Sequence, residues 1–244
     1  ADIAVVPTNF AAQIYNKGIK YELAVPSVWG IFYMVGTEEF SGWESLKGKE
    51  IYTIGRGLTP DITTRFILKK HGIDPDNDVT LTYLSGATEL APNFISGKSK
   101  LSIMPEPMLS TVLSKKQDAV IIVDFQKEWA EATGLGDSYP QASLVVKKEL
   151  ADNHPEVVES FINEYKKSIE WLYTDPQKAG QYAEELKTGI AADIVPAALP
   201  RMNIKFVSSD EGRQAVEAYL QVLLDSSPEM IGGKLPDESF YYKK

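Results

Sequence analysis

Residues 78 to 125 read DVTLTYLSGATELAPNFISGKSKLSIMPEPMLSTVLSKKQDAVIIVDF, and this stretch decides the fold. Three short runs rich in apolar and β-branched residues alternate with two segments that have helical spacing. Strands that alternate with helices of about ten to fifteen residues build βαβ units, whose strands run mainly parallel. The stretch therefore predicts an α/β fold with a mainly parallel sheet flanked by helices.

The same alternation extends outward from this stretch. Upstream, DIAVV is a strand that leads into a helix, and Ile51 to Ile54 is a strand that leads into a helix from Pro60. Downstream, the segment after YPQASLVVKKE is almost wholly helical. We expect two lobes with two hinge crossings and a ligand cleft where the lobes meet. The predicted lobes are residues 1–38 with 139–244 and residues 39–138, and the predicted crossings lie near residues 27–36 and 139–146.

The composition excludes several classes of function. The formal net charge is −9, which argues against a nucleic acid partner, and no run approaches the roughly 18 apolar residues that span a membrane. The chain has no cysteine, so disulfides, cysteine zinc sites and thiol nucleophiles are absent. His71 and His154 each lie beside a helix-end signal, Gly72 or Pro155, and a surface role is the favoured interpretation. We expect no metal, no cofactor and no catalytic residue.

Candidate binding residues come from the places where a strand is followed by a helix or crosses between lobes. In open α/β sheets, ligands bind outside the carboxyl ends of the strands, where free N–H groups at helix starts favour anionic or carbonyl-bearing solutes. The predicted ligand-binding residues are Thr8, Asn9, Trp29, Gly55, Arg56, Gly57, Thr59, Ser85, Thr88, Glu106, Tyr139 and Gln141.

Arg56 is the strongest of these candidates. Its flanking glycines let the backbone approach a ligand, and its planar guanidinium can hold a carboxylate, sulfonate or phosphate in two places. A solvated arginine in a turn is an equal alternative. Glu106 lies between two prolines at a helix start, where it could accept a hydrogen bond from a solute amine or only offset the helix dipole.

The other candidates have equally simple structural alternatives. Helix capping is favoured over ligand contact for the hydroxyl and amide side chains at helix starts, with Thr59 as the N-cap ahead of Pro60. Trp29 and Tyr139 lie at the crossings, where a core role and a ligand platform are nearly balanced. Gln141 could offer an amide at the cleft floor or face solvent.

Four segments give the chain a family resemblance. They are GWESLKGKEIYTIGRGLTP, SIMPEP, SYPQASLVVKKELADNHPEVVESFINEY and IGGKLPDESFYYKK. In this order they resemble the solute-binding proteins of bacterial ABC importers, in the branch labelled nitrate/sulfonate/bicarbonate, taurine or thiamine-pyrimidine precursor binding. The resemblance implies the type II periplasmic binding protein fold, a small anionic or heteroaromatic solute, and closure of the lobes about a hinge.

The resemblance also implies partners and a location. The partners would be a small-molecule solute and the transmembrane subunits of an ABC permease, and the chain itself would be a monomer. Such proteins usually begin with a signal peptide, often with a lipobox cysteine, and work in the periplasm or lipid-anchored at the outer face of the cell membrane. By this resemblance the given sequence starts at the strand that follows the family's first strand–loop–helix unit, and we expect the natural protein to have that unit.

Two other functions fit the same architecture. One is an enzyme, either a pyrimidine-precursor synthase, whose histidine and cysteine clusters the chain lacks, or a chorismate-type dehydratase. The other is the effector domain of a transcription regulator, which would need a helix-turn-helix segment upstream. A binding protein without catalytic activity is the favoured interpretation.

Overall fold

The computed structural model describes residues 1–135 and 138–243. The chain divides into two compact units. Unit 1 consists of Ala1–Gly30, Ser138–Ala179 and Met202–Lys244, and unit 2 consists of Ile31–Asp137 and Gly180–Arg201. The lobe bounds expected from the sequence stay a prediction.

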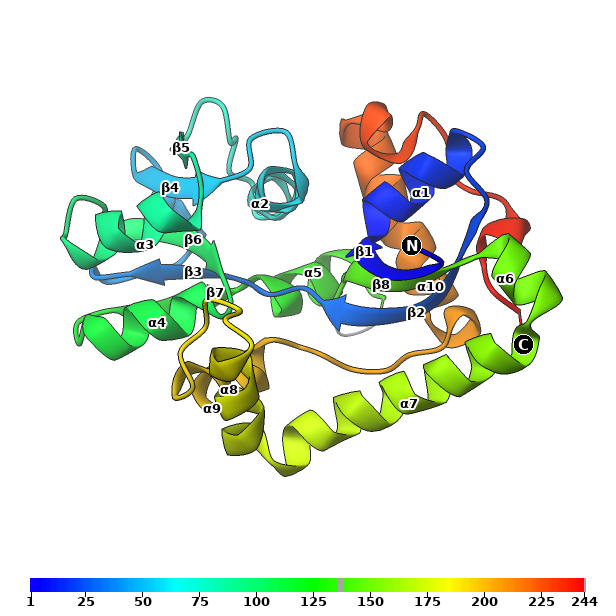
Figure 1. Ribbon diagram of the computed structural model, residues 1–244. Helices are drawn as coiled ribbons and strands as arrows, with labels where there is room; N and C mark the ends of the chain where they lie inside the picture. Colours follow the sequence, from blue (N-terminus) through cyan, green and yellow to red (C-terminus); the bar gives the residue numbers. More distant parts are fainter. Residues whose placement is uncertain (136–137, 244) are drawn as a thin grey trace. The chain divides into compact units, whose positions relative to one another are not determined.

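Unit 1 is built on a three-stranded antiparallel sheet with the strand order β1-β8-β2 (Figure 1). Its strands are β1 (Ile3–Pro7), β2 (Tyr21–Trp29) and β8 (Pro140–Lys147). Its helices are α1 (Thr8–Asn16), α6 (Lys148–Asn153), α7 (Pro155–Thr174) and α10 (Ser209–Ser226), with the 3-10 turns η3 (Pro228–Ile231) and η4 (Glu238–Phe240).

Apolar side chains of α7 explain how this helix packs on the sheet of unit 1. Val158 and Ile169 are buried, and Ile162 and Tyr165 lie between them at helical spacing. Val158 joins a core cluster with Val25 and Val146 of the sheet, against which Ile162 and Tyr165 also pack. Burial of this single face is what holds α7 on the sheet, because the rest of the helix is largely exposed.

Unit 2 is built on a five-stranded sheet with the order β5-β4-β6-β3-β7 (Figure 1). Its strands are β3 (Phe32–Gly36), β4 (Glu50–Ile54), β5 (Thr80–Leu84), β6 (Leu101–Pro105) and β7 (Val120–Asp124). Its helices are α2 (Thr59–Lys70), α3 (Ala87–Ile95), α4 (Met108–Lys115), α5 (Phe125–Thr133) and α9 (Ile194–Ala198), with the turns η1 (Trp43–Leu46) and η2 (Leu199–Arg201). Helix α8 (Pro176–Glu185) contains the boundary between Ala179 and Gly180.

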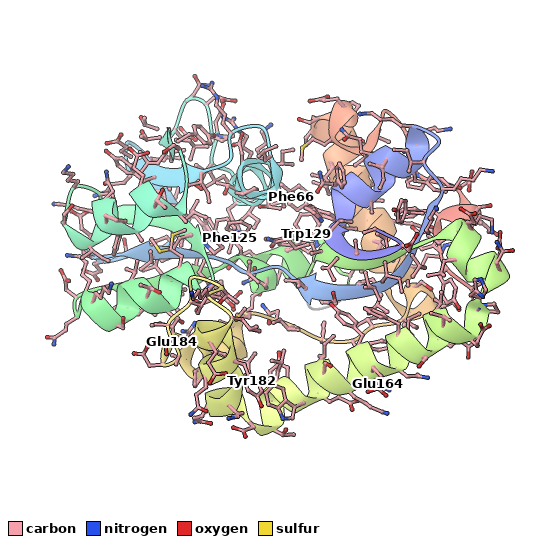
Figure 2. The ribbon with its side chains drawn as sticks, in the orientation of Figure 1. Phe66, Phe125, Trp129, Glu164, Tyr182 and Glu184 are labelled. Atoms are coloured by element: carbon pink, nitrogen blue, oxygen red, sulfur yellow. The ribbon has the colours of Figure 1, made fainter. Side chains whose placement is uncertain are left out.

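Aromatic and aliphatic side chains fill the interior of unit 2. A core cluster joins Phe94 of α3 and Leu109 of α4 to Met104 of β6. The fully buried Trp129 of α5 contacts Phe66 of α2, with ring centroids 4.9 Å apart (Figure 2). Burying an aromatic side chain contributes a large share of core stability, so these contacts fix the helices around the sheet.

The α/β fold expected from the sequence is confirmed, but neither sheet is mainly parallel, because the five-stranded sheet is mixed and the three-stranded sheet is antiparallel. Among the strands of the described residues, the parallel strand pairs are those of β4 with β5 and of β4 with β6. Strand β3 runs antiparallel to both of its neighbours, and β8 runs antiparallel to β1 and β2. The reason is that these two strands follow passages of the chain from one unit to the other rather than a helical crossover within a sheet.

The chain passes between the units four times, two more than expected. The additional passages enclose residues 180–201, whose apolar side chains Ile194 and Leu199 are buried in unit 2. Short apolar segments of this kind look like any other helix in the sequence, and only their burial assigns them to a unit. Among the described residues, no helix is both long and apolar enough to cross a membrane.

Candidate functional site

The register of the five-stranded sheet brings one group of predicted residues to a common edge. Strands β4 and β5 are parallel with Ile54 opposite Leu84, and β6 is parallel to β4 with Tyr52 opposite Ser102. The carboxyl ends of all three strands therefore lie at the same edge. The predicted residues that follow these ends are Gly55, Arg56, Gly57, Thr59, Ser85, Thr88 and Glu106.

The loop after β4 presents Arg56 at this edge. Gly55 and Gly57 have φ angles of 71° and 72°, in the left-handed region that favours glycine. The Leu58 N–H donates to the Gly55 carbonyl at 2.9 Å and closes the turn. Arg56 is exposed, and its guanidinium carbon lies 5.5 Å from the centroid of the Tyr83 ring. This cation–π contact holds the arginine over β5 and leaves its N–H donors available to an anion.

Asp61 organises the same loop, and the sequence analysis did not identify it. The buried carboxylate accepts hydrogen bonds from the Gly57 N–H at 2.7 Å, the Tyr83 hydroxyl at 2.6 Å and Arg65 Nε at 2.7 Å. It therefore fixes both the turn below Arg56 and the ring on which Arg56 rests. The sequence held one signal, an acidic residue in the first turn of a helix, but that pattern is usually read as a contact with the helix dipole.

Tyr83 gives this network a measurable pH dependence. Burial, followed by the hydrogen bond to Asp61, raises the pKa of Tyr83 to about 12 from the ordinary value of 10.0. Because the folded pKa lies above the unfolded one, the contribution of this group to stability is fully present below about pH 10 and is lost as the pH rises through 12. In denaturant titrations from neutral to alkaline pH, Tyr83→Phe should lose less stability above pH 10 than the parent protein.

Ultraviolet difference absorbance provides a second check on the same variant. Burial also raises the pKa values of Tyr15 and Tyr241, so the parent should show one more late-ionising tyrosine than Tyr83→Phe does. Identical alkaline titration curves for the two proteins, in stability and in absorbance, would contradict the assigned role of Tyr83.

The helix starts at this edge differ from the caps that the sequence predicts. Thr59 is the first residue of α2, and Leu58 is the N-cap without a side-chain hydrogen bond, so the predicted N-cap is wrong by one residue. Ser85 does not cap α3 as an acceptor, because its N–H and its hydroxyl both donate to Glu89 at 3.0 and 2.7 Å. Thr88 is exposed in the first turn of α3.

Glu106 is bound within unit 2. Its side chain is 0% exposed, and its carboxylate accepts from Ser110 N and Ser110 Oγ, both at 3.0 Å, and from Arg201 Nε at 2.5 Å. Arg201 Nη2 also donates to Ser110 Oγ at 2.8 Å and to the Ala197 carbonyl at 2.9 Å. Glu106 thus fastens residues 180–201 to α4, a role that the sequence analysis did not consider. Its contact with a solute stays a prediction.

A second group of predicted residues lies at one edge of the three-stranded sheet. Pro7, the last residue of β1, pairs with Ala142, and Trp29, the last residue of β2, pairs with Pro140. The carboxyl ends of β1 and β2 and the start of β8 therefore share an edge. The predicted residues at this edge are Thr8, Asn9, Trp29, Tyr139 and Gln141.

Most side chains of this second group make contacts inside unit 1. The buried Thr8 hydroxyl is 2.8 Å from Ser143 Oγ, and the Pro7 N-cap of α1 lacks a side-chain hydrogen bond. Asn9 Nδ2 lies 3.5 Å from the Met230 carbonyl, which is a weak hydrogen bond at best.

The two crossing aromatics of this group are both core residues. Trp29 is buried with Lys205 Nζ 4.5 Å from its ring centroid, and Tyr139 is buried in a stack on Tyr219, with centroids 5.6 Å apart. The structure therefore favours the core interpretation for these two residues. Gln141 differs, because its side-chain oxygen is buried without a hydrogen-bond partner among the described residues.

One sizeable cavity of unit 1 involves none of the predicted residues. It has a volume of 430 Å³ and is lined by α6, the start of α7 and the C-terminal segment. Its charged side chains are Glu22, Lys148, Asp152, Glu159, Glu238 and Lys243. Within residues 1–135 and 138–243, no group of three or more His, Asp and Glu side chains is arranged to hold a metal ion.

Comparison with known proteins identifies the family. The family model described as NMT1/THI5 like matches residues 26–179, more than half of the chain. The chain belongs to the NMT1/THI5-like family. The matched range includes the predicted binding residues from Trp29 to Gln141, whereas Thr8 and Asn9 precede it.

The chain is also similar to individual proteins. A curated relative, the putative binding protein YtlA of Bacillus subtilis, is 24% identical over 177 residues, which cover 70% of this chain and 51% of YtlA. The chain therefore spans about half the length of this relative. The crystal structure of an ABC transporter from Parabacteroides distasonis is 28% identical with a TM-score of 0.85, and the match covers 100% of this chain and 81% of that one.

A more distant structure supports the fold alone. The periplasmic aliphatic sulphonate binding protein SsuA of Escherichia coli is 11% identical with a TM-score of 0.70, over 100% of this chain and 78% of SsuA. The fold of this NMT1/THI5-like protein is that of the type II periplasmic binding proteins, as the sequence segments indicated.

Proposed function

We propose that this NMT1/THI5-like protein is the solute-binding component of an ABC importer, without catalytic activity. It captures a small anionic or heteroaromatic solute outside the cytoplasm and delivers it to the transmembrane subunits of a permease. The descriptions of two similar proteins, a putative binding protein and an ABC transporter, support this assignment.

The observation that carries the proposal is the exposed Arg56 at the carboxyl edge of the β4–β5–β6 sheet. Two left-handed glycines and the Asp61 carboxylate hold its loop, and the Tyr83 ring supports its guanidinium. A guanidinium held in this way can grip a planar carboxylate, sulfonate or phosphate in two places. One charge-assisted hydrogen bond contributes about 1.5 to 3 kcal/mol, whereas micromolar binding needs about 8 kcal/mol, so other contacts must contribute as well.

Native mass spectrometry of freshly purified protein tests the function. A binding protein should retain a small molecule that is recovered unchanged after long incubation. A retained molecule that is converted during incubation would indicate an enzyme instead. The predicted closure of two lobes about a hinge, and the predicted monomeric state, stay parts of the proposal that solution scattering with and without the solute can test.

Arg56→Ala should bind the identified solute at least about tenfold more weakly, because a tenfold loss corresponds to only about 1.4 kcal/mol, less than one charge-assisted hydrogen bond. Isothermal titration calorimetry measures this change. Arg213→Ala is the matched control, because Arg213 lies in unit 1 and pairs with Glu217 at 2.8 Å. Equal affinities for the Arg56 variant and the parent would mean that Arg56 is a surface arginine that does not contribute to solute binding.

A further inference from the structure

The 430 Å³ cavity of unit 1 lies far from the sheet edge that carries the predicted binding residues of this unit. Glu22, near the start of β2, lines the cavity, whereas Trp29, the last residue of β2, lies at that edge. An extended strand rises about 3.3 Å per residue, so roughly 20 Å separate the two positions. The cavity is therefore a separate place in unit 1, and its volume is in the range of about 300 to 1,000 Å³ that is usual for small-molecule pockets.

Carboxylate groups outnumber cationic groups in the lining of this cavity. Among the described lining residues, four carry a carboxylate and two are lysines. Lys148 Nζ already donates to Glu22 Oε1 at 3.0 Å and to Asp152 Oδ1 at 2.9 Å. Lys243 Nζ lies 3.7 Å from a carboxylate oxygen of Glu238. The excess of carboxylates gives the cavity a negative potential, which attracts a cation and repels an anion.

The hydroxyl of Tyr242 faces this cavity without a hydrogen-bond partner. Tyr242 is only 9% exposed, its ring packs in the core cluster with Val158 and Val146, and no described residue makes a hydrogen bond to its hydroxyl. Burial, followed by the carboxylates of Glu159 and Glu22, raises the pKa of Tyr242 above its ordinary value of 10.0. Both carboxylates line the cavity, so the hydroxyl on which they act faces it. Buried polar groups nearly always have a partner, and this hydroxyl needs one from outside the chain.

Glu22 provides a second acceptor in the same cavity. Its side chain is 11% exposed, and within the described part of the chain only one of its carboxylate oxygens, Oε1, has a hydrogen bond, the one from Lys148. An ammonium group has three N–H donors and no acceptor, so it can bind both the second Glu22 oxygen and the Tyr242 hydroxyl. A metal ion fits less well, because no group of three or more His, Asp and Glu side chains in the described ranges is arranged to hold one.

We propose that this cavity is a second binding site of the protein and that it takes a small organic cation with one or more ammonium groups. The ammonium N–H groups donate to the second oxygen of Glu22 and to the Tyr242 hydroxyl, and the other carboxylates of the lining balance the charge. Lys148 holds the carboxylates of Glu22 and Asp152 in place. The inference goes beyond the proposed function and does not depend on it, because no predicted solute contact lines this cavity.

Isothermal titration calorimetry with putrescine, a short linear diamine, tests this site. The titration is run at about 0.15 M salt, which screens the general attraction of cations to an acidic protein. Tyr242→Phe keeps the packed ring and removes the hydroxyl, and Glu22→Gln keeps the shape of the side chain and removes its charge. Each variant should bind putrescine at least about tenfold more weakly than the parent, as expected for the loss of a hydrogen bond to a charged group. Glu170→Gln, at an exposed position of α7 outside the cavity, is the matched control and should bind as the parent does.

A third variant should strengthen binding. Lys243→Gln removes a positive charge that competes for Glu238, and both side chains are exposed, at 64% and 71%, so the fold does not depend on the pair. The affinity for putrescine should rise about threefold, because an exposed ion pair of this kind is weak. An affinity equal to or below that of the parent would contradict the negative charge of the cavity as the cause of binding.

Hydrogen exchange locates the bound diamine. Putrescine should slow the exchange of the Tyr242 amide, which donates to the Leu23 carbonyl at 3.0 Å, and should leave the exchange of residues 55–58 unchanged. Butanediol of the same chain length carries no charge and should not bind. The inference is wrong if the parent does not bind putrescine, if butanediol binds equally well, or if Tyr242→Phe and Glu22→Gln both keep the parental affinity. None of these outcomes bears on solute binding at Arg56, which is measured with a different ligand.

Discussion

Replacing Glu106 with glutamine should lower the free energy of unfolding by about 3 kcal/mol, one of the largest effects that we expect from a single substitution. The variant removes a fully buried carboxylate that accepts from Ser110 and from Arg201. Breaking a buried ion pair at one partner costs about 3 to 5 kcal/mol, because the other charge remains without compensation. We expect the lower end, since the Arg201 side chain is 29% exposed and water can partly solvate it.

Denaturant unfolding followed by circular dichroism measures this change. The exposed Glu131→Gln is the matched control and should leave stability close to that of the parent. The double variant with Arg201→Met should recover part of the loss, because it removes the unpaired charge as well. Strictly additive effects of the two substitutions would contradict the ion pair as the source of stability.

Gly180→Ala should destabilise the protein by a similar amount, about 3 kcal/mol, at the upper end of the usual cost of overpacking. A Cβ atom at Gly180 would lie 2.1 Å from the Ala192 carbonyl oxygen and 3.0 Å from the carbonyl carbon. Both atoms belong to the backbone, so no side chain can rotate away, and α8 or the 190–194 segment must shift. The substitution therefore tests whether α8 packs against the segment that follows it.

Thermal and denaturant unfolding of Gly180→Ala give the result directly. Gly86→Ala is the control, because a Cβ at Gly86 would meet no atom within 4 Å. Alanine is the better helix former, so in the absence of the close approach Gly180→Ala would stabilise α8. A stable Gly180 variant would mean that residues 180 and 192 are farther apart than the structure places them.

The two largest effects concern residues that the sequence could not connect. Glu106 and Arg201 are separated by 95 positions, and Arg201 is one of four arginines in the chain. Neither the spacing nor the neighbours of either residue predict a pair, because the contact forms only when residues 180–201 fold back onto α4. The sequence analysis placed Glu106 correctly at the start of a helix but weighed only a solute and the helix dipole as its partners.

Sequence patterns were more informative about features that depend only on neighbouring residues, such as turns and helix starts. The glycines around Arg56 were expected to give the backbone unusual freedom to approach a ligand, and both have positive φ in the turn. Capping was less accurate, since Thr59 begins α2 rather than preceding it and Ser85 donates to Glu89. A hydroxyl side chain next to a helix start can accept a hydrogen bond as the N-cap, donate one to another side chain, or belong to the first turn of the helix. The differences in free energy between these states are small.

By itself, the sequence determined the α/β class, the alternation of strands and helices, and the loops that follow β4, β5 and β6. These features depend on the periodicity of apolar residues and on glycine and proline signals, which act over a few residues. Only the tertiary structure decided the mixed strand directions, the four passages between units, and the contacts of Asp61, Glu106 and Glu22. The physical reason is that burial and long-range pairing select these arrangements from many that satisfy the same local pattern.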